Sequence, residues 1–188
     1  MMRNATDEEL MLAYAAGDAA AFDSLYGRHR APVFRYVRRQ VSEDRIAEEI
    51  FQDIWMRVIK VRARYAASAR FTTWLYTIAH NRLMDHFRSL GAKPEEVPLL
   101  ADDNDDPEVP ASEADGPESS LMRRRIAERI LQALDALPSA QREAFVLQQE
   151  GSLTVEEIAK VTGVTRETAK SRLRYALAKL RQDLKDMR

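Results

Sequence analysis

Hydrophobic residues recur along most of this chain with the spacing of an α-helix, and no segment shows the strict alternation of a strand. A capping box formed by Thr6 and Glu9 predicts the start of a first helix, which Gly17 ends. A second helix is predicted over residues 19–41, with a kink or a break at Pro32.

Two more amphipathic helices follow. Ser42 is predicted to start a third helix, whose inner face carries hydrophobic residues four apart: Ile46, Ile50, Ile54 and Val58. A fourth helix is predicted to begin near Arg70, with one apolar stripe made of Phe71, Trp74, Leu75, Ile78, Ala79 and Leu83. The pattern therefore predicts a compact helical domain over residues 1–91.

A second group of helices is predicted in the last third of the chain. One helix spans residues 121–137 and stops at Pro138, and Ser139 is predicted to cap the next helix, which ends at Gly151. Together with two later helices, these segments predict a small C-terminal domain over residues 121–188. The fold class is all-α, with two small helical domains.

The segment between the two domains, residues 92–120, is acidic and rich in proline, as in "DDNDDPEVPASEADGPESS". It carries 1 basic and 10 acidic residues, whereas residues 1–91 carry 14 and 11 and residues 121–188 carry 14 and 9. Too few apolar side chains are present to offset the entropy of ordering. We expect a disordered acidic linker joining two basic domains.

Composition excludes several classes of protein. The chain has no cysteine, and its three histidines do not have the spacing of metal ligands, so we expect neither a metal nor a cofactor. No nucleophile–base pair or phosphate-binding glycine loop is evident, which argues against an enzyme. The chain has no signal peptide and no apolar run long enough for membrane insertion. We expect a cytoplasmic protein.

The sequence "TVEEIAKVTGVTRETAKSRLRYALAKL" has the layout of a helix-turn-helix. A capping box at Thr154 opens the first helix, Gly163 allows the tight turn, and Thr165 opens the second helix. The second helix has one apolar face, made of Ala169, Leu173, Ala176, Leu177, Leu180 and Leu184.

The outer face of this last helix is basic, with six basic residues and one acidic residue from Arg166 to Arg181. It combines short polar and Arg side chains, which read base edges, with cations that hold phosphates. The alternative interpretation of this basic face is an ordinary solvent-exposed helix in a helical bundle. The turn glycine, the small Ala159 and the basic face together favour DNA binding.

Two N-terminal stretches carry polar residues in distinct patterns. "IAEEIFQDIWMRV" leaves an acidic face outward, which by itself is most simply a solvated face. "RFTTWLYTIAHNRLMDHFR" has hydrogen-bond donors and cations on its outer face, which suit single-stranded DNA: Thr73, Thr77, His80, Asn81 and Arg88. Trp74 lies on the apolar stripe, so we expect it in the core rather than stacked on a base.

The chain resembles the bacterial sigma factors of the extracytoplasmic-function (ECF) group. The resemblance rests on "AEEIFQDIW" and "FTTWLYTIAHNRLMDHFR", which are similar to region two of that family. It rests also on "LPSAQREAF" and the helix-turn-helix, which are similar to the two parts of region four. The order and spacing of the motifs agree over nearly the whole chain.

The resemblance implies an all-α transcription initiation factor that binds core RNA polymerase, directs it to promoters and helps to melt the DNA, in a stress or envelope response. Core polymerase would be bound through the coiled coil of its largest subunit and through its flap. Contacts with the coiled coil would involve Glu48, Glu49, Gln52 and Asp53. The minus-ten element would be met by Tyr65, Ser68, Arg70, Asn81, Arg82 and Arg88. The minus-thirty-five element would be read by Arg166, Thr168, Lys170, Ser171, Arg172, Arg174 and Tyr175. An anti-sigma factor is a further expected partner.

One loop departs from the family pattern. The loop over residues 65–70 reads "YAASAR", without the glycine and acid that family members often have there, so its base preference is open.

The resemblance to the family also implies that the linker threads a polymerase channel that binds polyanions. The alternative is that the linker is a solubilising tether. The alternative function is a two-domain helix-turn-helix regulator that is not a polymerase subunit.

Overall fold

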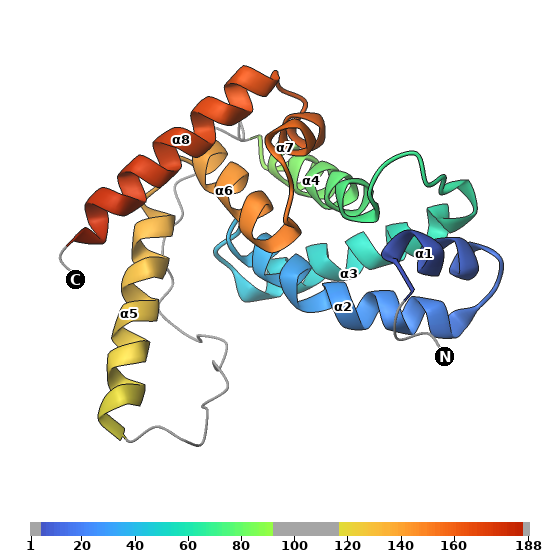
Figure 1. Cartoon of the computed structure of the whole chain (residues 1–188), viewed down its shortest axis with the longest axis horizontal. Helices are drawn as coiled ribbons and strands as arrows, with labels where there is room; N and C mark the ends of the chain where they lie inside the picture. Colours follow the sequence, from blue (N-terminus) through green and yellow to red (C-terminus); the bar gives the residue numbers. More distant parts are fainter. Residues whose placement is uncertain (1–4, 92–116, 186–188) are drawn as a thin grey trace.

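The computed structural model describes residues 5–91 and 117–185, and within these ranges every regular element is helical (Figure 1). The N-terminal elements are α1 (Asp7–Ala15), α2 (Ala19–Arg38), α3 (Asp44–Val61), the 3-10 turn η1 (Arg62–Arg64) and α4 (Phe71–Ser89). The C-terminal elements are α5 (Pro117–Asp135), α6 (Ser139–Gly151), α7 (Val155–Thr162) and α8 (Arg166–Asp183). The all-α fold class is confirmed.

Most helix ends follow the predicted capping chemistry. Both capping boxes are formed, Thr6 with Glu9 at α1 and Thr154 with Glu157 at α7. Gly163 ends α7 in the left-handed region, with φ +67°, a conformation that glycine adopts without steric cost. The helix-turn-helix is therefore built as the sequence predicts.

Several local predictions of helix starts and breaks are wrong. Helix α2 has no break at Pro32 and ends at Arg38. Helix α3 begins at Asp44, with Glu43 as its N-cap, rather than at Ser42. The N-cap of α6 is Pro138, and Ser139 is the first helical residue, with no side-chain cap. Helix α5 begins at Pro117 rather than at residue 121, because proline suits the first helical turn. The disordered linker predicted over 92–120 lies outside the described residues, except for 117–120.

Helices α2, α3 and α4 pack together, and α1 crosses one end of them (Figure 1). Their inner faces form the N-terminal part of the core, with large side chains that are fully buried: Leu25, Tyr36, Ile50, Ile54, Phe71, Leu75, Tyr76 and Leu83. An aromatic group lines the α2–α3 side, where Trp55 meets Phe22, Tyr26 and Phe51 edge-on. Such ring contacts add to the stability gained by burial.

The C-terminal helices α6 and α7 lie directly against α2 and α4 (Figure 1). Leu147, Leu153, Ile158 and Val161 join the hydrophobic cluster that contains the core of α1–α4. The two halves therefore share one continuous core, which the picture of two separately tethered domains did not predict.

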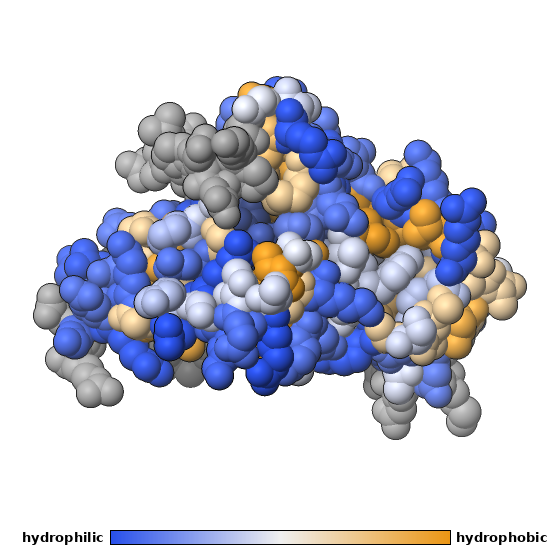
Figure 2. Space-filling view, turned by 90° about the horizontal axis from the view of Figure 1, so that it is seen from above, coloured by the Kyte–Doolittle hydropathy of each residue, from blue (hydrophilic) through white to orange (hydrophobic). Residues whose placement is uncertain are grey.

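Helix α8 packs against α6 and α7, and its Ala169 and Leu173 belong to the shared core. Its C-terminal part pairs with α5, which projects away from that core (Figure 1). A smaller hydrophobic cluster joins them, made of Ala133, Leu134, Leu137, Ala176 and Leu180. On the face seen in Figure 2, hydrophilic residues cover most of the surface, and hydrophobic residues form separate patches. Across the described ranges, no helix combines the length and apolarity needed to cross a membrane.

Candidate polymerase and nucleic-acid interfaces

The acidic face of α3 is exposed. Glu48, Glu49, Gln52 and Asp53 all lie on the solvent side, because the opposite side of the helix buries Ile50, Ile54 and Val58. The side chains of Glu49 and Asp53 are 58% and 49% exposed. A basic surface can therefore approach Glu48 and Gln52 directly from the solvent side.

Arg82 of α4 lies beside this acidic face. Its Nε donates to Oδ2 of Asp53 at 2.8 Å, and its Nη2 lies 3.8 Å from Oε1 of Glu49. The structure therefore places Arg82, expected at the minus-ten element, against the residues expected to bind polymerase. The hydrogen bond orients the carboxylate of Asp53, and the charge of Arg82 attracts that of Glu49.

The loop over residues 65–70 is anchored by a buried Tyr65, which is 8% exposed. The ring of Tyr65 packs edge-on against Trp74, at 5.1 Å between centroids, and against Phe71, at 6.2 Å. Burial, and next the negative charges of Glu8 and Asp7, raise the pKa of Tyr65 to about 12. Tyr65 and Trp74 thus belong to the core, whereas Ser68 is exposed at the tip of the loop.

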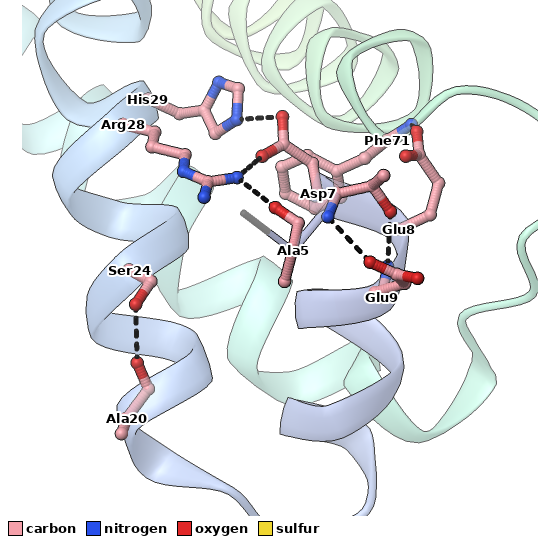
Figure 3. A network of polar contacts seen from close by, with 10 residues as sticks. Ala5, Asp7, Glu8, Glu9, Ala20, Ser24, Arg28, His29 and Phe71 are labelled. Carbon is pink, nitrogen blue, oxygen red and sulfur yellow. Dashed lines mark hydrogen bonds and ion pairs between the residues drawn. The ribbon is translucent and has the colours of Figure 1, made fainter. Parts of the chain in front are cut away.

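A carboxylate from α1 caps the start of α4. The N-cap residue Arg70 supplies no side-chain cap, and Oε1 of Glu8 instead accepts the backbone N–H of Phe71 at 2.7 Å. Figure 3 shows Glu8 reaching Phe71 from α1. An anion at a helix N-terminus is favourable because unpaired N–H groups and the helix dipole both attract it. Glu8 therefore ties α1 to the junction between loop and α4.

A second contact holds α1 on α2 (Figure 3). Asp7 accepts from Arg28 and pairs with Nε2 of His29, each at 2.7 Å. The hydrogen bond from His29, followed by that from Arg28, lowers the pKa of Asp7 against the opposing effect of burial. These contacts fix the position of α1, and with it that of Glu8.

Removing the Glu8 carboxylate should loosen this junction. We expect Glu8→Ala to lower the free energy of unfolding by about 1 kcal/mol, the usual cost of losing a helix cap. Glu8→Gln keeps an acceptor oxygen and should lose less. Urea unfolding monitored by circular dichroism measures both variants, and an Ala variant as stable as the wild type would show that Glu8 does not stabilise α4.

The outer face of α4 divides into an open part and a covered part. Asn81 and Arg88 are exposed, and Arg88 makes a surface ion pair with Asp85, at 3.1 Å. Thr73 and His80, by contrast, bond to glutamates of the C-terminal half, at 2.8 and 2.7 Å. The structure thus does not bring all the predicted single-strand residues to one accessible surface.

The outward face of α8 carries the residues expected to read duplex DNA. Arg166, Lys170, Arg174 and Tyr175 are exposed, while Thr168, Ser171 and Arg172 are partly buried. The guanidinium of Arg174 lies over the ring of Tyr175, 4.9 Å from its centroid. This cation–π contact limits the rotamers of Arg174 and points it along the exposed face.

The N-terminus of α8 is tied to α7. Arg166 bonds to Glu156, and this hydrogen bond is the main reason why the pKa of Glu156 is lowered and that of Arg166 raised. Thr165 caps α8 by accepting the N–H of Thr168 at 3.2 Å. Arg166 thus links the start of α8 to α7 at the surface, while Thr165 satisfies a free N–H at the start of α8.

Comparison with known proteins gives matches over both halves of the chain. The family model Sigma-70 region 2 matches residues 25–93, and Sigma-70, region 4 matches residues 127–180. RNA polymerase sigma factor CarQ of Myxococcus xanthus is 32% identical over 171 residues, which cover 91% of this chain and 93% of CarQ. ECF RNA polymerase sigma factor SigK of Mycobacterium tuberculosis is 32% identical over 186 residues, which cover 97% of this chain and 96% of SigK.

The chain belongs to the ECF family of RNA polymerase sigma factors. Two solved structures have a similar fold. One is CnrH in complex with the cytosolic domain of CnrY, with a TM-score of 0.65 and 21% identity over 96% of this ECF sigma factor and 97% of that chain. The other is the sigma factor RpoE in complex with the anti-sigma factor NepR from Bartonella quintana, with a TM-score of 0.67 and 22% identity over 89% and 98%.

Sequence reasoning about this ECF sigma factor missed two carboxylates. Glu8 precedes the range matched by the region 2 model, and nothing in its local sequence points to α4. Glu143 had a signal: it falls on the apolar side of α6, in register with Ala144, Leu147 and Gly151. A carboxylate inside an apolar stripe indicates a buried polar contact.

Proposed function

We propose that this chain acts as a transcription initiation subunit, which binds core RNA polymerase, directs it to specific promoters and helps to melt the DNA. One observation carries the proposal: a chain of the ECF family presents an exposed acidic face on α3 and an exposed basic recognition helix, α8. Residues 1–91 would act as the region 2 domain and 121–188 as the region 4 domain. This division is supported by the two matched ranges.

The α3 face would bind the basic coiled coil of the largest polymerase subunit. Glu48, Glu49, Gln52 and Asp53 supply the complementary charge and hydrogen-bond acceptors, which favour fast and specific association. The region 4 domain would contact the polymerase flap. Arg82 bonds to Asp53 and lies near Glu49, and it would act on the polymerase through them.

The minus-ten element would meet the loop and the outer face of α4. Ser68, Asn81 and Arg88 are exposed there, and Arg70 is half-exposed. Tyr65 would hold the loop in shape from below, so that backbone groups rather than its ring receive the flipped base. Extruding a base costs a few kcal/mol, which contacts to the single strand offset.

Helix α8 would lie in the major groove of the minus-thirty-five element. Arg174 and Tyr175 would reach base edges, while Lys170 and Arg172 would hold phosphates on either side. Arg166, Thr168 and Ser171 complete this face near the N-terminus of the helix. The proposed place of action is the cytoplasm. An anti-sigma factor is a proposed partner, because one solved structure of similar fold is a sigma factor in complex with an anti-sigma factor.

Substitutions on α8 should separate base reading from phosphate binding. In reconstituted holoenzyme, Arg174→Ala should cost ~1–3 kcal/mol of promoter affinity and relax specificity at one base pair. Lys170→Ala should weaken binding to all sequences alike and flatten the dependence on salt. Lys179→Ala, further along α8, is the control. Equal losses for Arg174→Ala on every sequence would exclude it from base reading.

Association with core polymerase tests the proposal against the alternative of an independent regulator. The purified chain, labelled with a fluorophore, should bind core polymerase with one-to-one stoichiometry in an anisotropy titration without DNA. A helix-turn-helix regulator that is not a polymerase subunit needs its operator first. Saturable binding to promoter DNA with no binding to core would overturn the proposal.

A further inference from the structure

Three glutamates of the C-terminal half, spaced seven residues apart, bond to donors of the N-terminal half. They are Glu143 and Glu150 on α6 and Glu157 on α7. We propose that they imitate the phosphates of a DNA strand and make the C-terminal domain an intramolecular competitor for the single-strand surface of the N-terminal domain. This inference rests on the proposed function and adds a regulatory state to it.

Glu157 pairs with Arg70, a cation of the proposed minus-ten site. Its Oε2 lies 3.3 Å from Nη1 of Arg70, and its Oε1 accepts from the hydroxyl of Thr73 at 2.8 Å. The carbonyl of Ser152 also accepts from Arg70, at 3.1 Å. While Nη1 of Arg70 and the hydroxyl of Thr73 bond to these oxygens, these two groups are not available to a strand.

Glu143 fills the middle of the contact. Its Oε1 accepts from the hydroxyl of the fully buried Tyr36 at 2.7 Å and lies 2.7 Å from Nδ1 of His80. His80 belongs to the outer face of α4, next to the exposed Asn81. Two donors of the N-terminal half therefore converge on one carboxylate.

Glu150 closes the edge of the contact through Arg35 of α2. The guanidinium donates twice, from Nε to Oε1 at 2.9 Å and from Nη2 to Oε2 at 2.7 Å. This paired geometry is the one by which arginine binds carboxylates and phosphates alike. The pair is partly exposed, with 47% of the Arg35 side chain and 21% of the Glu150 side chain accessible.

Apolar packing accompanies the three glutamates and leaves little room between the halves. A Cβ atom on Gly151 would lie 2.8 Å from Cε2 of Tyr76 and 2.4 Å from Cδ1 of Leu153. Because the core is continuous across this contact, the closed form is a stable state of the unbound chain. A strand gains access to Thr73, His80 and Nη1 of Arg70 only in the fraction of molecules that open.

Reversing the charge of Glu150 tests the competition. Glu150→Arg sets two arginines against each other at a partly exposed position, so the fraction of open molecules should rise without loss of the fold. Arg35→Glu with Glu150→Arg restores the pair in reverse and should close it again. Glu128→Arg, an exposed residue of α5, makes the same change of charge away from the contact and is the matched control.

Two readouts follow opening and binding separately. The chain has no cysteine, so Ala31→Cys on α2 and Ala178→Cys on α8, both exposed, accept a donor and an acceptor dye. Energy transfer between them should fall in Glu150→Arg and recover in the swapped variant. Fluorescence anisotropy of a labelled, mixed-sequence single-stranded oligonucleotide then measures affinity without polymerase.

We expect Glu150→Arg to bind the oligonucleotide about tenfold more tightly than Glu128→Arg, since apparent affinity scales with the open fraction. The swapped variant should return towards the wild type. Glu150→Gln, which removes the pair without adding a cation, should move both readouts less and in the same direction. A chain that stays closed in Glu150→Arg, or an open chain that binds no better than the control, would overturn the inference.

The same proteins separate this inference from the proposed function. If the wild-type chain initiates transcription with core polymerase but the open variants gain no affinity for the single strand, only the proposed competition is disproved. If the wild-type chain binds no core polymerase, the proposed function is disproved, whatever the open variants do.

Discussion

Replacing Glu49 and Asp53 by lysine should weaken binding to core polymerase by about 2–3 kcal/mol, or roughly 30- to 150-fold. Both side chains are about half exposed, so the substitutions leave the core of α3 intact. They replace attraction by repulsion at a face that would meet a basic coiled coil. They also remove the carboxylates that Arg82 holds.

A matched control makes this result specific. Asp23→Lys with Glu128→Lys gives the same total change of charge at exposed positions on α2 and α5. Anisotropy titration against core polymerase should show a small loss for the control and a large one for the α3 variant. Equal losses, with circular dichroism showing both proteins folded, would mean that the acidic face of α3 is not the contact.

Glu143→Ala should lower the free energy of unfolding by about 2–4 kcal/mol, the largest stability effect we expect from one polar side chain. Glu143 is 8% exposed, and its removal leaves the hydroxyl of Tyr36 and the ring of His80 without their acceptor. Burial, together with the nearby charge of Glu143, raises the pKa of Tyr36, so Tyr36 stays a donor.

The comparison of Glu143→Ala with Glu143→Gln identifies the cause. Glutamine fits the same space and keeps an oxygen that accepts from Tyr36, so its loss should be less than half as large. Urea unfolding followed by circular dichroism gives both values, with the m-value as a check on cooperativity. An alanine variant within experimental error of the wild type would show that this buried contact does not hold the two halves together.

The sequence was sufficient to predict the helices and the exposure of the acidic face of α3 and of the basic face of α8, because both depend on local pattern. The capping boxes at Thr6 and Thr154, the turn at Gly163 and the apolar face of α8 are set by nearby residues. Residues that share a helix face follow from the helical period, and so the acidic face of α3 was correctly placed in solvent.

What the sequence did not predict depends on contacts between distant segments. Glu8 and Phe71 are far apart along the chain, as are Arg35 and Glu150, and no periodicity links them. Arg70 and Tyr65 share one loop, yet one faces the C-terminal half and the other the core. Proline at position 32 favours a break, but Val33, Tyr36 and Val37 are buried in the core, and this tertiary packing favours a continuous α2.

Run-off transcription with purified core polymerase is the most direct test of the central claim. A library of linear templates with varied minus-ten and minus-thirty-five elements is transcribed with core alone, with core and the chain, and with core and the Glu49→Lys, Asp53→Lys variant. We predict discrete transcripts from a subset of templates only when the wild-type chain is added, and few or none with the variant. A wild-type chain that binds core polymerase yet yields no template-specific transcript would contradict its assignment as an initiation factor.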